Sequence, residues 1–361
     1  MEKIEFNLKK RSDKVRLPEP LGFGKYFTDH MFEMDYSTSK GWHNPKITPV
    51  QNLPMHPGTM FMHYGQAIFD GLKAFKTVDG DIVVFRPDKH FQRLNNSARK
   101  LCMPEVNLPF ILDALNELLL VEKDWVPEKE GESLYIRPFV LGTDPFLGVK
   151  PSSTYKLIIL LSPVGAYYPE GFKPVKILAQ DDYVRAVRKG IGDCKTPANY
   201  AASLYAGEEA RKKGFTQVLW LDAVEQKYIE EVGTMNLFIR FKNEVATPAL
   251  SGSILPGITR QSVLQILKEW GENVSERQIS IEEVVDEYKK GNVLSVFGTG
   301  TAAIISSVGW LTYKDTEMII NNGKPDDLAV KLFNEITSIH YGKVEDKRGW
   351  LTYVTEKEIS A

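Results

Sequence analysis

VKILAQ (175–180), ANYAASLYAGEEARKK (198–213) and QVLWL (217–221) succeed one another along the chain and decide its fold class. The first and third are short apolar runs typical of strands, and the second has the length and composition of a helix. In the first half, the strand-like runs DIVVF (81–85) and KLIILL (156–161) also alternate with helical patterns. This alternation indicates an α/β or α+β chain.

The length of the chain predicts two domains. It has 361 residues, and a domain commonly contains ~100–200 residues. The segment SPVGAYYPEGFKP (162–174) is rich in Gly, Pro and aromatic residues and has neither a helical nor a strand period, so we place the boundary there. We expect a small α/β domain over 1–164, an interdomain loop over 165–175 and a larger domain over 176–361.

Three helix starts can be proposed from capping residues. Asp88, just after Arg86 and Pro87, can cap one helix, and Thr259 can cap another. Ser280 and Glu283 have the spacing of a capping box, in which each side chain bonds a free backbone N–H of the first turn.

The charge and composition exclude several classes of protein. The 45 basic residues nearly cancel the 47 acidic ones, so no global field attracts nucleic acid or an anionic membrane, and small molecules are the expected partners. The uncharged stretch between Lys290 and Lys314 is long enough to span a bilayer, but its glycines and hydroxyl residues predict buried core instead. The two cysteines, Cys102 and Cys194, and a start without an apolar signal core indicate a cytoplasmic protein.

Lys195 is the first candidate for chemistry. In GDCKTPANY (192–200) it lies among small, uncharged residues just before a predicted helix. A lysine in such a place can be partly desolvated, which favours the neutral amine that Schiff-base formation needs. A solvated loop lysine is the alternative, and Tyr200 can either share the site or pack in the core.

Other segments offer an acid and anion-binding groups. EEVGTMNLF (230–238) carries an acidic pair directly before a Gly-Thr turn and a strand. An acid at this position can point into a cleft, and the alternative is a solvated loop carboxylate. LPGITRQS (255–262) and FGTGTAA (297–303) are Gly-rich turns that can offer backbone N–H groups to a phosphate at a helix start. Arg86, before another helix, can bind a phosphate or carboxylate or form a surface ion pair.

Several other chemistries lack their sequence signatures. The six histidines are scattered and the cysteines form no CxxC pair, so we expect no metal site. There is no GxSxG elbow, no GxGxxG turn at dinucleotide spacing and no GxxxxGK[ST] loop. A lysine, an acid, a tyrosine, an arginine and two anion-binding turns are together what pyridoxal phosphate requires.

Seven motifs then identify a resemblance that covers nearly the whole chain. They are HYGQAIFDGLKAF, LYIRP, PVGAYY, GDCKTPANY, EVGTMNLF, LPGITRQS and FGTGTAA. In this order they resemble the branched-chain-amino-acid aminotransferases, which are pyridoxal-phosphate enzymes of fold type IV. The resemblance implies a two-domain fold with the cofactor at the domain interface and a homodimer in which the loop TDPFLGV (143–149) reaches the other subunit's site.

The resemblance also implies roles for residues at the cofactor. Lys195 matches the lysine that holds the cofactor and moves the proton between the substrate Cα and the cofactor C4′. Glu231 matches the acid that keeps the pyridine nitrogen protonated, and Tyr200 matches the tyrosine on the phenolic oxygen. The residues that match the phosphate site are Arg86, Ile258, Thr259 and Thr301.

The substrate residues follow by the same resemblance. The substrate carboxylate is expected near Thr301 and Ala302, with help from Tyr64. Arg137, in LYIRP, can bind the second carboxylate of glutamate at the rim of a pocket that also accepts leucine. The remaining matches at the substrate pocket are Phe69, Tyr135, Tyr167 and Thr234.

The implied activity is transamination of L-leucine, L-isoleucine and L-valine with 2-oxoglutarate. The alternatives are a fold-type IV D-amino-acid aminotransferase or aminodeoxychorismate lyase, and a silent binding protein of the same fold. Two departures from the family pattern stand out. Asp70 replaces the glutamate of many relatives, and AAIIS (302–306) lacks the CxxC thiol switch of mammalian members.

Overall fold

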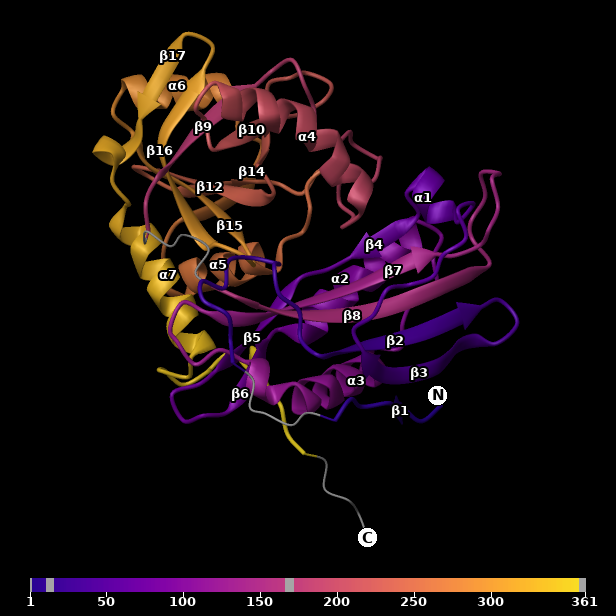
Figure 1. Ribbon diagram of the computed structural model, residues 1–361. Helices are drawn as coiled ribbons and strands as arrows, with labels where there is room; N and C mark the ends of the chain where they lie inside the picture. The colour runs from indigo at the N-terminus through magenta and orange to yellow at the C-terminus, as the bar shows by residue number, and fades with distance from the viewer. Residues whose placement is uncertain (1, 11–15, 166–171, 357–361) are drawn as a thin grey trace. The chain divides into compact units, whose positions relative to one another are not determined.

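The computed structural model describes residues 2–10, 16–165 and 172–356, and the chain divides into two compact units (Figure 1). The first unit is Met1–Tyr167, Lys195–Pro197 and Thr337–Ala361, and the second is Tyr168–Cys194 and Ala198–Ile336. Each unit has its own nine-stranded sheet, which confirms the mixed α/β class. Within the described part, no helix has the length and apolarity needed to cross a membrane.

The first unit is a largely antiparallel sheet with helices packed against it. Its strand order is β1-β3-β2-β8-β7-β5-β6-β18, with β4 paired to β7. The strands are β1 (Glu5–Phe6), β2 (His30–Ser37), β3 (Gly41–Pro49), β4 (Ala67–Phe69), β5 (Leu72–Lys76), β6 (Ile82–Phe85), β7 (Ser133–Gly142), β8 (Thr154–Val164) and β18 (Leu351–Tyr353). The helices are α1 (Met60–Tyr64), α2 (Pro87–Lys100), α3 (Leu108–Val121) and the 3₁₀ turn η1 (Lys123–Trp125).

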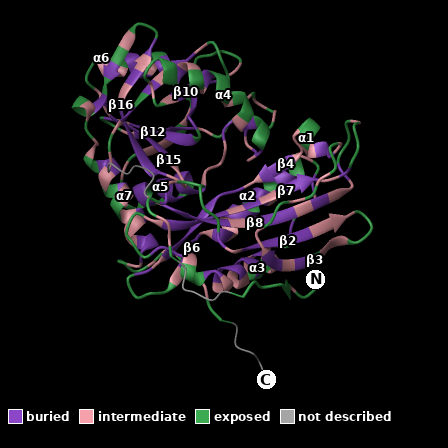
Figure 2. Ribbon diagram, viewed as in Figure 1, coloured by how far each residue is buried: buried purple, intermediate pink, exposed green. Residues whose placement is uncertain are grey.

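Apolar side chains of α2 and α3 form the core of this unit with the sheet. Phe91, Leu94 and Ala98 recur at three- and four-residue spacing, so they share one face of α2 and are buried. Ile111 and Leu115 do the same on α3. These residues belong to one cluster with strand residues of the sheet, and the strands are accordingly among the most buried parts of the unit (Figure 2).

The second unit contains a closed sheet. The strands follow the order β11-β10-β9-β16-β15-β12-β13-β14, with β17 on β16, and an additional β11–β12 pairing closes the path into a barrel. The strands are β9 (Val175–Gln180), β10 (Gln217–Leu221), β11 (Ile229–Val232), β12 (Met235–Phe241), β13 (Val245–Pro248), β14 (Val274–Arg277), β15 (Val293–Gly300), β16 (Ile304–Tyr313) and β17 (Thr316–Ile319). The helices are α4 (Pro197–Lys212), α5 (Ile258–Glu269), α6 (Ile281–Lys289), the 3₁₀ turn η2 (Ile320–Gly323) and α7 (Asp327–His340). The first residue of α4 and the end of α7 from Thr337 belong to the first unit.

The two units divide the chain differently from the sequence-based boundaries. Residues 195–197 and 337–361 belong to the first unit, although they follow the expected boundary at 165–175. The reason is backbone pairing, since β18 hydrogen-bonds along β6 and the Lys195 segment bonds to residues of the first unit. Residues 166–171 of the expected interdomain loop lie outside the described residues.

Two of the three expected helix caps are wrong. The residue at the start of α2 is Arg86, in the left-handed region with φ 48°, and Asp88 lies inside the first turn. The cap of α5 is Gly257, so Thr259 is a residue of the helix itself. The third cap is confirmed, because the Ser280 Oγ accepts a hydrogen bond of 3.0 Å from the Glu283 N–H.

The segment FGTGTAA is a strand and a hairpin turn, not a helix start. Gly298 and Gly300 lie in β15, and the chain returns directly as β16. A Cβ at Gly298 would come within 2.9 Å of the Met235 methyl group, so glycine here makes room for that side chain. The expectation of buried core for the uncharged stretch is confirmed, because most of β15 and β16 is buried.

Candidate active site

Hydrogen bonds within the first unit fix the backbone of Lys195 on both sides. Its N–H donates to the Ser97 Oγ at 2.9 Å, and its carbonyl accepts from the Phe69 N–H at 3.0 Å. Burial, aided by the positive charge of Arg93, lowers the pKa of Lys195 to about 8. On the order of a tenth of the amine is then neutral at pH 7, as expected for the partly desolvated lysine that the sequence predicts, and its role as a nucleophile stays a prediction.

Phe69, Tyr135 and Arg137 form a wall beside Lys195. The Lys195 Nζ lies 4.9 Å from the centroid of the Phe69 ring, and the Arg137 guanidinium carbon lies 4.7 Å from the same centroid. Arg137 also donates from Nη2 to the Tyr135 hydroxyl at 2.9 Å. The wall therefore presents two aromatic rings and one guanidinium.

Gly71 makes room for this wall. A Cβ on Gly71 would lie 1.9 Å from the Tyr135 hydroxyl oxygen and 2.7 Å from the ring carbon that carries it. Any side chain at 71 would therefore push Tyr135 away from Arg137. This is a physical reason for the glycine in the motif FDGLKAF.

Asp70, His90 and Arg93 form a buried cluster in the same unit as Lys195, and the sequence does not single them out as a group. Asp70 is fully buried and accepts hydrogen bonds from the His90 Nδ1 at 2.7 Å and from the Arg93 Nη2 and Nε at 2.7 and 2.9 Å. Despite the opposing effect of burial, the charges of Arg93 and His90 and these hydrogen bonds hold the pKa of Asp70 well below its usual range. The available signal was polar residues at 90, 93 and 97 on the buried face of α2.

Arg86, the arginine expected at the phosphate, lies against Trp350. Its backbone N–H donates to the Trp350 carbonyl at 2.7 Å, and its guanidinium carbon lies 5.3 Å from the centroid of the Trp350 ring. The arginines whose charges act on Lys195 are Arg93 and Arg137. A contact between Arg86 and a phosphate stays a prediction.

In the second unit, Glu231 is a buried and well-supported carboxylate. It is 3% exposed, which rules out the solvated alternative, and its Oε1 accepts from the Leu255 N–H at 2.8 Å and from the Asn236 Nδ2 at 3.3 Å. The Arg185 Nε lies 3.1 Å from its Oε2 as an ion pair. Glu231 lies within β11 and is joined to β12 by the two-residue turn Gly233–Thr234, so a rigid hairpin positions it.

Tyr200 and Thr234 line the same pocket as Glu231. The pocket encloses about 320 Å³ of empty space, part of it open to solvent. Tyr200 comes from the first turns of α4, and Thr234 comes from the hairpin turn. The complete lining is Arg185, Cys194, Asn199, Tyr200, Ser203, Glu231, Gly233, Thr234 and Leu255.

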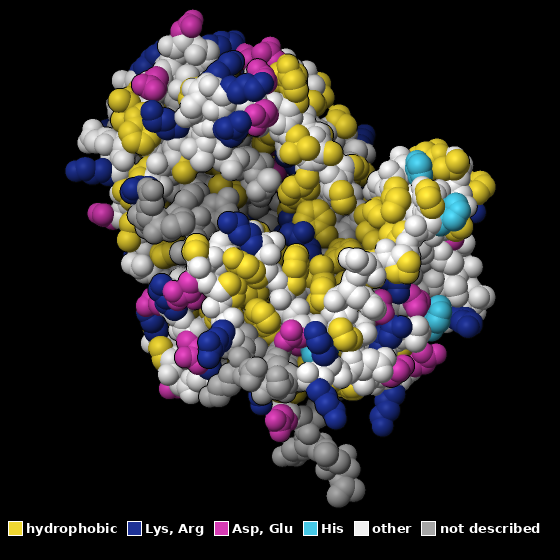
Figure 3. Space-filling view, in the orientation of Figure 1, with side chains coloured by type: hydrophobic (Ala, Val, Ile, Leu, Met, Phe, Trp, Pro, Cys, Tyr) yellow, Lys and Arg dark blue, Asp and Glu magenta, His cyan; other side chains and the backbone are white. Residues whose placement is uncertain are grey.

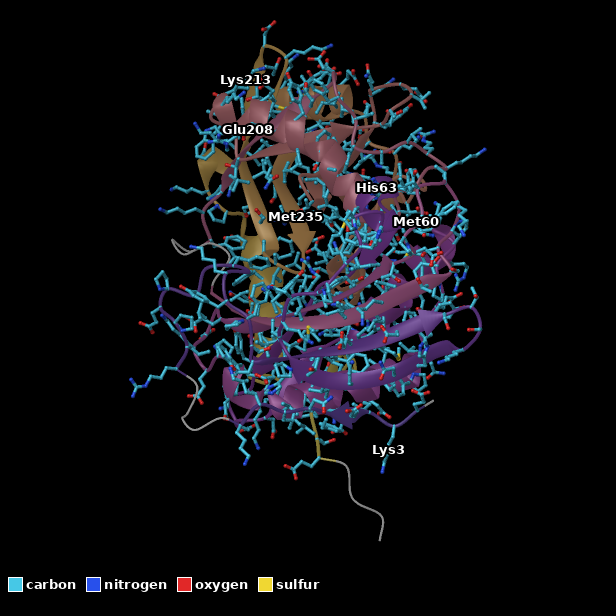
Figure 4. The ribbon with its side chains drawn as sticks, turned by 45° about the vertical axis from the view of Figure 1, so that its right-hand side comes forward. Lys3, Met60, His63, Glu208, Lys213 and Met235 are labelled. Atoms are coloured by element: carbon cyan, nitrogen blue, oxygen red, sulfur yellow. The ribbon has the colours of Figure 1, made fainter. Side chains whose placement is uncertain are left out.

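The two anion-binding turns expected from the sequence belong to the same unit and connect to Glu231. Asn236 donates to the Leu255 carbonyl at 2.9 Å, just before Ile258 and Thr259 open α5. Asn236 also lies opposite Thr299 in the β12–β15 pairing, and Thr301 and Ala302 follow in the turn between β15 and β16. Met235, the first residue of β12, is labelled in Figure 4.

Tyr64, a further substrate candidate, is an exposed residue of the first unit. It is 41% exposed at the end of α1, a helix marked by Met60 and His63 in Figure 4, and its hydroxyl donates to the Leu147 carbonyl. Tyr167 lies outside the described residues. The substrate roles of both stay predictions.

Each unit thus provides a distinct chemical capability. The first provides a lysine amine of lowered pKa next to an aromatic and cationic wall. The second provides a buried carboxylate held by an arginine, with backbone N–H groups at the start of α5. An amine, a fixed acid and an anion-binding turn suit a cofactor that carries an aldehyde, a basic ring nitrogen and a phosphate.

Comparisons with known proteins agree with this chemistry. The model of the family "Amino-transferase class IV" matches residues 67–308. The chain is 52% identical to "Branched-chain-amino-acid aminotransferase 2" of Bacillus subtilis over 98% of both proteins. It is 43% identical to the "Branched-chain-amino-acid aminotransferase" of Mycolicibacterium smegmatis over 96% of both.

The fold of this chain is also similar to that of a solved branched-chain amino acid aminotransferase. The branched-chain amino acid aminotransferase of Escherichia coli is 28% identical to this chain with a TM-score of 0.76. The match covers 91% of this chain and 100% of that one. The chain therefore belongs to the class IV aminotransferases and, within them, to the branched-chain-amino-acid aminotransferase family.

Proposed function

We propose that the protein transfers the amino group of L-leucine, L-isoleucine and L-valine to 2-oxoglutarate, giving branched-chain 2-oxo acids and L-glutamate, with pyridoxal 5′-phosphate as its cofactor. The observation that carries the proposal is the half-buried Lys195, with its pKa lowered to about 8, beside the wall of Phe69 and Arg137. Relatives of this name at 52% identity over 98% of the chain support the choice of substrate class.

The donor set of this chain fits pyridoxal phosphate. Lys195 supplies the amine for the aldehyde, and Glu231 supplies an acceptor for a protonated pyridine nitrogen. Tyr200 lines the Glu231 pocket and can donate to the phenolic oxygen. The N–H groups of Ile258 and Thr259 open a helix of twelve residues and can bind the phosphate, with Thr301 and Arg86 as further candidates.

The chain's own residues divide the work of transamination. When bound, the cofactor supplies a ring that accepts the electrons left on the substrate Cα. Lys195 takes the proton from the substrate Cα and delivers a proton to the cofactor C4′. An amine with a pKa near 8 can both accept and release a proton at neutral pH. Arg185 pairs with Glu231 as an ion pair, and the Glu231 carboxylate can accept the proton-bearing ring nitrogen as a hydrogen-bond donor.

The wall beside Lys195 explains how one pocket can accept two kinds of side chain. The rings of Phe69 and Tyr135 offer apolar surface to the methyl groups of leucine. The Nε of Arg137 is buried and has no hydrogen-bond partner among the described residues, so the guanidinium has capacity left for the second carboxylate of glutamate.

We also propose a homodimer in which the loop over 143–149 packs on a second copy of the chain. Phe146, Leu147 and Val149 of this loop are 46%, 66% and 85% exposed, although they are apolar. Figure 3 shows hydrophobic side chains gathered on the surface around α1, whose Met62 is also exposed. Sedimentation of the enzyme loaded with its cofactor (the loaded enzyme) should show a dimer. Val149→Asp should shift the equilibrium toward the monomer. A cytoplasmic location stays a prediction from the cysteine content.

The test is the visible absorption spectrum of the loaded enzyme, recorded after addition of L-leucine and again after 2-oxoglutarate. The cofactor band should disappear with L-leucine and return with 2-oxoglutarate, and Lys195→Ala should show neither change. Lys213→Ala, on an exposed lysine at the end of α4, is the matched control. A response to D-leucine instead of L-leucine would replace the proposal with a D-amino-acid aminotransferase.

A further inference from the structure

A buried charge cluster connects the segment after β4 to helix α2. Asp70 is 0% exposed, His90 is 2% and Arg93 is 6% exposed. Besides its bonds to His90 and Arg93, the Asp70 Oδ1 accepts from the Gly71 N–H at 2.7 Å. A buried carboxylate is destabilising unless hydrogen bonds and an opposite charge compensate for its lost hydration. The donors around Asp70 provide both.

The same face of α2 also holds Lys195. Ser97 lies four residues after Arg93, one helical turn further along, and accepts the Lys195 N–H at 2.9 Å. Phe69, whose N–H donates to the Lys195 carbonyl, is the residue directly before Asp70. One helix face therefore fixes Asp70 through His90 and Arg93 and fixes Lys195 through Ser97.

We propose that Asp70 and Arg93, with His90, are positioning residues that hold the Lys195 segment in place through helix α2 and set the charge around the Lys195 Nζ. The inference rests on the proposed role of Lys195 as the cofactor lysine. It gives Asp70 a function that a purely structural ion pair would not have.

The two charged members act on Lys195 in opposite directions. The charge of Arg93 lowers the pKa of Lys195, and the charge of Asp70 raises it. Burial lowers the pKa of His90 as well, so the imidazole is neutral near pH 7 and the cluster has no net charge. Tyr135 and Arg137 also act on Lys195, raising and lowering its pKa, and both stay unchanged when the cluster is altered.

The experiment is a pH titration of the visible spectrum of the loaded enzyme, which follows the protonation of the Lys195 nitrogen attached to the cofactor. Arg93→Met should move the midpoint upward and Asp70→Asn should move it downward, each by ~1 pH unit. Arg93→Lys and Asp70→Glu keep the charges and should return the midpoint toward that of the unaltered enzyme. Arg99→Met, on an exposed arginine of the same helix, should leave it unchanged.

If Asp70 and Arg93 had only a structural role, Arg93→Met and Asp70→Asn would both lower the thermal stability. Their titration midpoints would not shift in opposite directions. Equal midpoints, or shifts in the same direction, would therefore overturn the inference. If Asp70→Asn does not fold, Arg93→Met decides alone, since an upward shift supports the inference and no shift overturns it.

Borohydride reduction of the cofactor-bound enzyme, followed by peptide mass measurement, distinguishes a failure of the proposed role of Lys195 from a failure of the charge cluster. Cofactor fixed to another lysine would overturn the proposed role of Lys195 and, with it, this inference. If the cofactor is fixed to Lys195 but the titration midpoints of Arg93→Met and Asp70→Asn do not move apart, only the inference about the charge cluster is overturned.

Discussion

The N–H of Phe69 donates a 3.0 Å hydrogen bond to the carbonyl of Lys195, and the ring of the same Phe69 lies 4.9 Å from the Lys195 Nζ. One residue thus fixes the backbone of Lys195 and provides the surface against which its side chain lies. Because Phe69 also stacks with Arg137, the lysine and the substrate wall share a single support. Small changes at this point of the first unit should affect both the reaction and the choice of substrate.

Replacing Glu231 with Gln should lower kcat by about 10²–10³-fold, because a neutral amide does not hold a proton on the cofactor's ring nitrogen. Stopped-flow measurement of the leucine half-reaction checks the expectation. Glu208→Gln, on an exposed glutamate of α4, is the control. A loss of less than about threefold would assign the supporting acid to another residue.

Replacing Arg137 with Ala should reduce kcat/KM for glutamate by a further ~10-fold or more compared with leucine. The reason is that a charged hydrogen bond to the second carboxylate is lost, whereas the rings that contact leucine remain. The half-reactions with the two amino acids, measured separately, give the ratio. Equal losses would show that Arg137 does not distinguish the two substrates.

Gly71→Ala should destabilise the protein by ~1–3 kcal/mol and raise KM for leucine, because the new Cβ occupies the place of the Tyr135 hydroxyl. Chemical denaturation and steady-state kinetics measure the two effects. Gly207→Ala is the matched control, since a Cβ at this position of α4 meets no atom within 4 Å and alanine favours a helix. Similar behaviour of both variants would contradict the role given to Gly71.

His340 should make the protein sensitive to acid. Its ring is stacked on Phe75 with 4.3 Å between centroids, and neither ring nitrogen has a hydrogen-bond partner among the described residues. Burial, followed by the nearby charge of Lys73, lowers the pKa of His340 from 6.5 to about 3. Between these values the unfolded chain binds a proton that the folded protein excludes, so the free energy of unfolding falls by ~1.4 kcal/mol per pH unit as the pH falls.

The comparison of His340→Phe with the unaltered protein tests this sign. Denaturation midpoints at several pH values from 7 to 4 should fall more steeply for the unaltered protein. His63→Phe, on the exposed face of α1, should retain the steep fall. Parallel curves for His340→Phe and the unaltered protein would place the acid sensitivity elsewhere.

The sequence predicts the strands of the two sheets well, because runs such as 156–161 and 175–180 are apolar, short and bounded by turns. It also selects Lys195 and the acidic pair at 230–231 as candidates from local patterns, and the family resemblance then singles out Glu231. It misreads Gly298 and Gly300 as turn residues, because the need for glycine arises from Met235 on a neighbouring strand, which no local pattern reveals. Close approach between strands is a tertiary property.

The Asp70 cluster shows the same limit for the site. Asp70 and Arg93 are 23 residues apart, and only the packing of α2 under the sheet brings them together. The helical spacing of His90, Arg93 and Ser97 was visible in the sequence, but polar residues on a helix are usually solvated. What marks them as special is their burial, which depends on the rest of the fold.

The pairing of β18 with β6 has a consequence for how the protein is made. Residues 82–85 leave the ribosome early, but Leu351–Tyr353, which cover them, are synthesised only after the whole of the second unit. Until then, β6 presents an open edge, and an exposed strand edge can pair with the wrong chain. The first sheet is therefore the last to be completed, and chains released early would be the ones that aggregate.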